Sequence, residues 1–180
     1  MRVYALYLIV AFLSLCAFRD WFKALCGLIL LTTLSQHPDM PHAVLGIGGL
    51  NPWNFLFFVI VTARIVEQNP SRGGPSSRFR VAVFGYIALI LVGGIRAMVD
   101  TEAMEARGAF PGQTAMLFDL ILNPLKYLAV GALFCDGCRT RRRAWLGVHT
   151  LLLLGLLHAL MMYKTMKGLV LFGNYADARR

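Results

Sequence analysis

A polar stripe interrupts one of the most apolar stretches of this chain. Asp119, Asn123 and Lys126 follow one another at intervals of four and three residues, which places the three side chains on one face of a helix. Pro124 lies within the stripe and should kink that helix and free a carbonyl upstream. A kinked polar face inside an apolar bundle is typical of the wall of a substrate path, but polar groups of neighbouring helices could also satisfy it.

Arg96 is a second charged residue within an apolar stretch, about three residues, or roughly 5 Å of helix rise, from its outer end. Asp119 lies at a similar depth in the next stretch, so two interpretations stay open. Arg96 could pair with Asp119 and lock two helices together, or it could face a cavity and bind an anionic substrate group. Lys126 lies too deep in its own stretch for the ammonium to reach water easily, so it is a further candidate ligand for such an anion.

No other group of residues predicts a metal, a cofactor or a catalytic centre. Cys135 and Cys138 form a single C-x-x-C pair, without the second pair of ligands that a structural zinc site needs. His149 and His158 are nine residues apart, on opposite faces of one helix, which argues against a haem with two histidine ligands. Motifs of nucleotide-binding, serine-hydrolase and zinc-protease sites are absent from the sequence. We expect no metal and no cofactor, and the catalytic residues of any enzyme activity stay undefined.

The apolar blocks must position these side chains. Hydrophobic residues make up 58% of the chain and fall into about six blocks, each roughly long enough to cross a bilayer. We predict spans at Val3–Phe18, Phe22–Ser35, Pro52–Val66, Val81–Val99, Thr114–Phe134 and Ala144–Met162. The second and third blocks are short, so they are expected to tilt little, to lie at the edge of the bundle or to borrow residues from loops. Asn51, a good N-cap, and Pro52 predict the start of the third helix.

The fold class that follows is an all-α, polytopic transmembrane helical bundle of about six spans. Residues 1–162 form the bundle in this interpretation. The segment Tyr163–Arg180 carries four cations with apolar residues between them, and we expect it to lie at the membrane interface rather than to cross it.

The charged residues predict how the bundle is oriented. The formal net charge is +9, and most cations lie between apolar blocks, where they face anionic lipid and set the topology rather than bind nucleic acid. Every second connection is basic, and the basic set is Arg19, Lys23, Arg64, Arg72, Arg78, Arg80, Arg139, Arg141, Arg142 and Arg143. The opposing connections hold only Arg107. The positive-inside rule places the basic set in the cytoplasm, so we expect a bacterial inner-membrane protein with both termini outside.

Several segments resemble the N-terminal part of the O-antigen ligase and polymerase-like membrane proteins. They are Phe18–Trp21, His37–Pro41, Leu45–Asn54 and Phe172–Arg180. Members of that family are glycosyltransferases that use undecaprenyl-diphosphate-linked glycans on the periplasmic side, with arginines thought to grip the diphosphate. The resemblance implies this role for Arg179 and Arg180, whereas Arg96 and Lys126 match no family motif. Because family members carry a long periplasmic loop and further spans that this chain lacks, it implies binding of the lipid-linked sugar without transfer by this chain alone.

Three functions stay open on the sequence. The first is a relative of the lipid-linked glycan ligases and polymerases, in which the stripe and the tail arginines line one cavity. The second is a non-enzymatic accessory subunit of a larger membrane complex, which the minimal loops and small residues such as Gly93 and Gly94 favour. The third is a small transporter, which only the polar stripe favours, because no internal repeat is visible.

Overall fold

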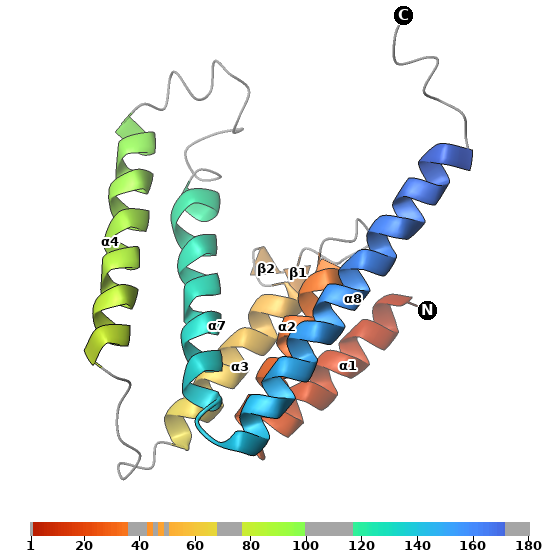
Figure 1. The fold of residues 1–180 in the computed structure, drawn as a ribbon, viewed down its shortest axis with the longest axis horizontal. Coiled ribbons are helices and arrows are strands. Elements are labelled where there is room, and N and C mark those ends of the chain that lie inside the picture. Colours follow the sequence, from red (N-terminus) through yellow and green to blue (C-terminus); the bar gives the residue numbers. More distant parts are fainter. Residues whose placement is uncertain are drawn as a thin grey trace, which may run out of the picture. The chain divides into compact units, whose positions relative to one another are not determined.

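The structure is a computed structural model that describes residues 2–35, 43–44, 47–48, 51–67, 77–99 and 117–171. Nearly all of these residues are helical, and only Ala43–Val44 (β1) and Ile47–Gly48 (β2) pair as a short antiparallel ladder (Figure 1). The predicted all-α fold is therefore confirmed for this part of the chain. Two compact units are present, Met1–Gln68 with Thr140–Arg180, and Asn69–Arg139.

The first unit is a bundle around one central helix. It contains α1 (Arg2–Ala17), α2 (Trp21–Ser35), α3 (Pro52–Val66) and α8 (Arg141–Leu171). Helix α2 packs against the other three (Figure 1), and it supplies most of the fully buried large side chains, which are Trp21, Phe22, Leu25 and Leu28 from α2 with Pro52, Leu56 and Ile60 from α3. The short second block thus lies at the middle of this unit rather than at its edge, because a helix that is apolar on all sides is best buried by several neighbours.

Two helices of this unit begin with the capping residues that helix starts favour. The side chain of Asn51 accepts a hydrogen bond from the Asn54 amide at 2.7 Å, and Pro52 occupies the first helical turn. This confirms the predicted start of α3. At α8, the Thr140 hydroxyl accepts a hydrogen bond from the Arg143 amide at 3.3 Å, which satisfies one of the unpaired N–H groups of the first turn.

The second unit is built from α4 (Ser77–Val99), a π-helical turn η1 (Phe118–Leu122) and α7 (Asn123–Gly137), which continues directly from η1. Helix α4 packs against both. At Gly94 the helices approach closely, because an added Cβ would clash with Cγ1 and Cδ1 of Ile121. Gly93, by contrast, has open space around it, so only one of the two adjacent glycines serves helix packing.

The π-helical turn lies where Pro124 was expected to disturb the helix. The Asn123 amide donates to the carbonyl oxygen of Phe118, five residues back instead of four. Pro124 has no N–H to donate and its ring crowds the preceding turn. A π-turn absorbs such a conflict within an otherwise continuous helix, and turns of this kind are frequent at functional sites.

The helix lengths separate the elements into two classes. Within the described residues, three helical segments are long and apolar enough to cross a membrane: Phe79–Val99, Phe118–Gly137 and Arg141–Lys164. The helices α1, α2 and α3 are apolar but shorter, and at 1.5 Å per residue they reach about 22–24 Å against a hydrocarbon core of about 30 Å.

The predicted boundaries agree with most helix ends to within a few residues, and α3 spans the predicted Pro52–Val66. Thr114, the predicted start of the fifth block, lies outside the described residues. Helix α8 runs without a break past residues 162 and 163 to Leu171. The predicted boundary between the bundle and the basic tail is therefore not a helix end, and residues 172–180 lie outside the described part of the chain.

Candidate functional site

The predicted polar stripe is a chain of hydrogen bonds along one helix face. The Lys126 ammonium donates to Oδ1 of Asn123 at 2.9 Å, and Nδ2 of Asn123 donates to Oδ1 of Asp119 at 3.0 Å. The amide of Asn123 thus turns its oxygen to the cation and its nitrogen to the carboxylate. This orientation aligns the amide dipole with both charges, so the three side chains hold one another in place.

Lys126 lies near the middle of the span-length segment Phe118–Gly137. It is eight residues from one end and eleven from the other, or about 12 Å and 16 Å of helix rise. The side chain is half-buried, and its ammonium also lies 5.5 Å from the centroid of the Tyr127 ring. A cation at this position is costly in hydrocarbon, and the bonds to Asn123 and the contact with Tyr127 offset part of that cost.

The other predicted anion ligands are not brought to this stripe. Arg96 lies in the last turn of α4 with its side chain exposed, a position that the helix dipole favours for a cation. The Asp119 carboxylate accepts its hydrogen bond from Asn123 on the same helix face, and among the described residues no ion pair joins it to Arg96. Arg179 and Arg180 lie outside the described residues.

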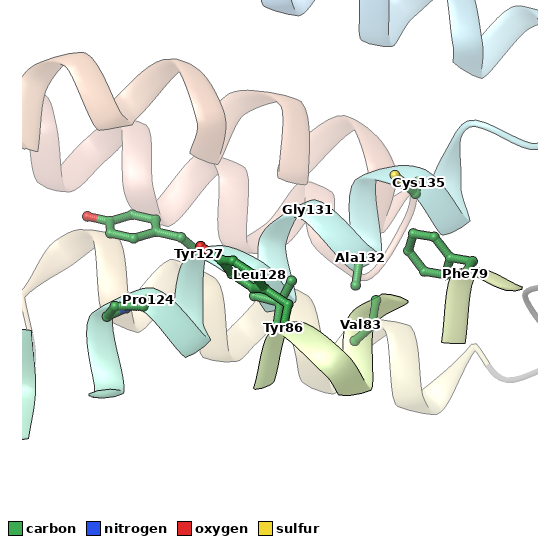
Figure 2. Close-up of a pocket in the computed structure, with 9 residues that line it drawn as sticks. All are labelled: Phe79, Val83, Tyr86, Pro124, Tyr127, Leu128, Gly131, Ala132 and Cys135. Atoms are coloured by element: carbon green, nitrogen blue, oxygen red, sulfur yellow. The ribbon is translucent and has the colours of Figure 1, made fainter. Parts of the chain in front are cut away.

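A groove runs between α4 and α7 on another side of α7. Its volume is about 550 Å³, and its lining is mostly apolar (Figure 2). The lining residues are Phe79, Val83 and Tyr86 from α4 and Pro124, Tyr127, Leu128, Gly131, Ala132 and Cys135 from α7. None of the stripe residues is among them. Lys126 and Leu128 are two residues apart, so their side chains leave the helix about 200° apart, and the stripe and the groove occupy different faces.

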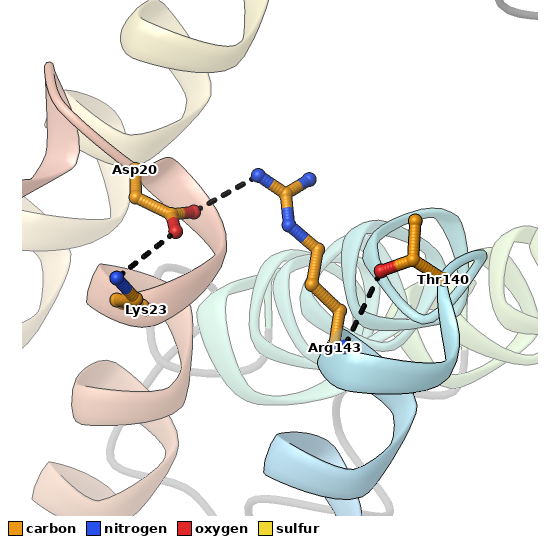
Figure 3. A network of polar contacts seen from close by, with 4 residues as sticks. All are labelled: Asp20, Lys23, Thr140 and Arg143. Carbon is orange, nitrogen blue, oxygen red and sulfur yellow. Dashed lines mark hydrogen bonds and ion pairs between the residues drawn. The ribbon is translucent and has the colours of Figure 1, made fainter.

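A second polar cluster, which the sequence did not reveal, joins the α1–α2 turn to the start of α8. Oδ1 of Asp20 accepts a hydrogen bond from Nη2 of Arg143 at 3.0 Å, and Oδ2 lies 3.5 Å from the Lys23 ammonium (Figure 3). The side chains of Asp20 and Arg143 are each about three-quarters buried. The one hint in the sequence was a single carboxylate in a basic turn.

Two buried aromatic rings lie against the Arg143 side of this cluster. Trp21 and Phe22, both buried, meet edge to face with ring centroids 5.9 Å apart. The Arg143 guanidinium lies 5.7 Å from the centroid of each ring, and the Arg64 guanidinium lies 5.2 Å from that of Trp21. Contacts of this kind hold planar cations against an aromatic face. Two arginines from different helices are therefore positioned at one buried tryptophan.

The cysteines and histidines are distributed over separate environments. Cys135 is exposed and Cys138 is partly buried. Burial, and secondarily the charge of Cys135, raises the pKa of the Cys138 thiol, which makes it a poorer nucleophile and metal ligand at neutral pH. Nδ1 of His149 bonds the carbonyl oxygen of Trp145, four residues back, and His158 makes the same bond to Leu154. In the described part of the chain, no three potential metal-binding side chains come together.

No family model, no curated protein and no solved structure matches this chain. The resemblance to O-antigen ligases consequently depends on the short segments noted above.

Proposed function

We propose that this protein is a multi-pass membrane protein that binds the diphosphate of a lipid-linked glycan, as a relative of the O-antigen ligases and polymerases. The first support is the surface of its helices. Large apolar side chains such as Leu8, Phe84 and Val92 are more than 65% exposed, and this exposure is costly in water but not in lipid. The three span-length segments support membrane crossing, and together with the three shorter apolar helices they match in number the six crossings that we propose.

The Lys126 stripe is the observation that carries the binding proposal. A lysine ammonium near the centre of a span-length helix is costly to place in hydrocarbon, and intramembrane cations commonly mark substrate paths. Asn123 orients this ammonium, and the π-turn beside it is of the type found at functional sites. In a water-poor setting each contact between an ammonium and a diphosphate is stronger than in bulk solvent. Arg96, Arg179 and Arg180 are the proposed additional cations.

The test is native mass spectrometry of the full chain, extracted gently with its own bacterial lipids. We expect undecaprenyl-diphosphate-linked glycan on the wild-type protein and a loss of roughly tenfold or more in the bound fraction for Lys126→Met, because a hydrogen bond to a charged group contributes about 1.5–3 kcal/mol. Lys126→Arg keeps the charge and should retain the ligand in part. Lys164→Met removes an exposed cation of α8 and serves as the matched control. Equal retention by Lys126→Met and Lys164→Met would exclude the stripe as the binding site.

The groove between α4 and α7 favours a second candidate function, a non-enzymatic subunit of a larger membrane complex. Gly131 and Ala132 line this groove and have small side chains. Small residues of this kind allow helices to approach closely in membranes. The same experiment separates the two functions. A protein partner at fixed stoichiometry, without any glycolipid, would contradict the glycan proposal and favour the subunit. The double variant Arg179→Ala/Arg180→Ala tests the tail arginines. It should lower glycolipid retention if the protein binds the lipid-linked glycan, and it should have no such effect if the protein is a non-enzymatic subunit.

A further inference from the structure

Cations are concentrated at one end of the first unit. At this end α1 and α3 finish, and α2 and α8 begin. The cations are Arg19, Lys23, Arg64, Arg141, Arg142 and Arg143, and we call this set the basic end. Contacts between residues distant in the chain bring it together, because Arg143 bonds Asp20, and both Arg64 and Arg143 lie over Trp21. The carboxylates described at this end are Asp20 and Glu67. The described cations therefore outnumber the described carboxylates threefold.

Part of the basic end is neutralised and held in place, and part of it is not. Asp20 offsets charge at Arg143 and Lys23. Arg19, Arg141 and Arg142 instead have exposed side chains. Arg141 and Arg142 also occupy the first turn of α8, where the helix dipole disfavours cations. An anion placed against this end would lower the repulsion among the arginines and complement the first turn of α8.

Exposed apolar side chains flank these cations at the same helix ends. Phe18 is 66% exposed at the end of α1, Ile65 is 58% exposed at the end of α3, and Trp145 is 56% exposed at the start of α8. A surface with cations beside exposed aromatic and aliphatic groups matches the bilayer interface, where phosphates lie just above the acyl chains. A soluble acidic protein or a nucleic acid would leave these apolar groups in water.

We propose that the basic end is a binding surface for the phosphate headgroups of anionic phospholipids. Arg141 and Arg142 contact the phosphates, the Asp20–Arg143 pair and Trp21 hold the first turn of α8 at the required place, and Phe18 and Trp145 lie among the acyl chains. The surface would select anionic over zwitterionic lipid and so anchor the first unit to one leaflet. This inference does not depend on glycan binding at Lys126.

The test measures lipid affinity on the full-length protein. The purified chain is titrated by native mass spectrometry with phosphatidylglycerol and, separately, with phosphatidylcholine. For wild-type protein we expect clear preference for phosphatidylglycerol that weakens as salt is raised. Each basic residue near an anionic surface contributes enough for about fivefold in affinity, so Arg142→Gln should bind phosphatidylglycerol about fivefold more weakly and Arg141→Gln/Arg142→Gln roughly thirtyfold more weakly.

Lys164→Gln is the matched control, because Lys164 is also exposed on α8 but lies 22 residues, or about 33 Å, from Arg142. Its affinity should stay within twofold of wild type. Equal binding of the two phospholipids by the wild-type protein would overturn the proposal, as would an equal loss in Lys164→Gln and Arg142→Gln. A third arm adds inorganic phosphate. Full displacement of phosphatidylglycerol by millimolar phosphate would show a site for free phosphate instead and would also overturn the proposal.

Discussion

The hydrogen bond between Asp20 and Arg143 joins two parts of the chain that are 123 residues apart in sequence. The Asp20 carboxylate is shared between Lys23, one turn along α2, and Arg143 at the start of α8. Because Asp20 and Arg143 are both mostly buried, neither charge can recover full hydration if its partner is removed. The pair is therefore worth more to stability than an exposed surface ion pair.

We expect Asp20→Asn to lower the free energy of unfolding by roughly 1–2 kcal/mol, since it keeps the shape of the side chain but leaves the Arg143 guanidinium without a carboxylate. Thermal and denaturant unfolding of the purified protein in detergent would measure the change. Lys23→Gln is the control. Lys23 is 63% exposed and pairs with the same carboxylate from one turn along the helix, and such local pairs contribute only about 0.2–0.5 kcal/mol. Equal losses in the two variants would contradict a bridging role for Asp20.

The Cys138 thiol should ionise at a higher pH than an ordinary cysteine. Because burial raises the pKa of the Cys138 thiol, its thiolate fraction at pH 7–8 is smaller, and iodoacetamide should alkylate it more slowly than the exposed Cys135. The difference should shrink as the pH rises through the Cys138 pKa. Cys135→Ser removes the neighbouring thiolate charge, which is the smaller cause of the raised pKa. The alkylation midpoint of Cys138 should then move to lower pH, but burial should keep its pKa above that of an ordinary thiol. Peptide-level mass spectrometry gives both rates.

The raised pKa of Cys138 also makes the free energy of unfolding depend on pH. The folded state holds the Cys138 proton more tightly than the unfolded chain does, so the free energy of unfolding should fall as the pH rises through the ordinary thiol range. Cys138→Ala should remove this part of the alkaline loss. An alkaline loss that is identical in Cys138→Ala and wild type would contradict the assignment.

At the scale of the elements, the packing of α4 depends on which side of the helix a small residue faces. Gly93 and Gly94 are adjacent and chemically identical, yet only Gly94 lies against Ile121. The sequence predicted that small residues in this helix would allow close approach, but not which of the two would do so. The helix rotation that decides this is set by the contact with η1 and α7.

Gly94→Ala and Gly93→Ala should therefore change stability in opposite directions. Both substitutions favour the helix by up to about 1 kcal/mol. The new methyl group of Gly94→Ala would also have to displace Ile121, and overpacking of this kind costs roughly 1–3 kcal/mol. We expect Gly94→Ala to unfold at a lower temperature than Gly93→Ala in detergent. Ile121→Val should partly rescue Gly94→Ala, and equal melting temperatures for the two glycine variants would contradict the packing.

At the scale of the whole molecule, the arrangement of helix ends bears on orientation in the membrane. The contacts among Asp20, Trp21, Arg64 and Arg143 bring the basic ends of four helices together in the first unit. This is the arrangement that the positive-inside rule requires if these helices cross a bilayer. The predicted six spans then place both termini on the opposite side.

We predict that a membrane-impermeant maleimide will label Cys135 only after the cells are permeabilised, because Cys135 precedes a connection of the basic set and its side chain is exposed. The measurement uses a background with the other three cysteines changed to alanine. A cysteine-free chain carrying Ala106→Cys, in the connection that holds Arg107, should label in intact cells. Labelling of Cys135 in intact cells, or of both positions only after permeabilisation, would contradict the proposed topology.

The sequence by itself determined the features that depend on local periodicity. Apolar blocks predicted the helices with their approximate ends, and the spacing of Asp119, Asn123 and Lys126 predicted a face on which the structure finds two hydrogen bonds. Pro124 predicted a kink and a freed upstream carbonyl, and the structure has a π-helical turn directly before it. These inferences needed only the helix geometry.

The tertiary structure alone decided which helices meet and which charges pair. The central place of α2, the choice of Gly94 over Gly93 and the Asp20–Arg143 pair all depend on contacts between distant segments. Burial of uniformly apolar helices is nearly non-directional, so hydropathy cannot distinguish one set of neighbours from another. Shape complementarity and a few partly buried charges make that choice, and they exist only once the helices are packed.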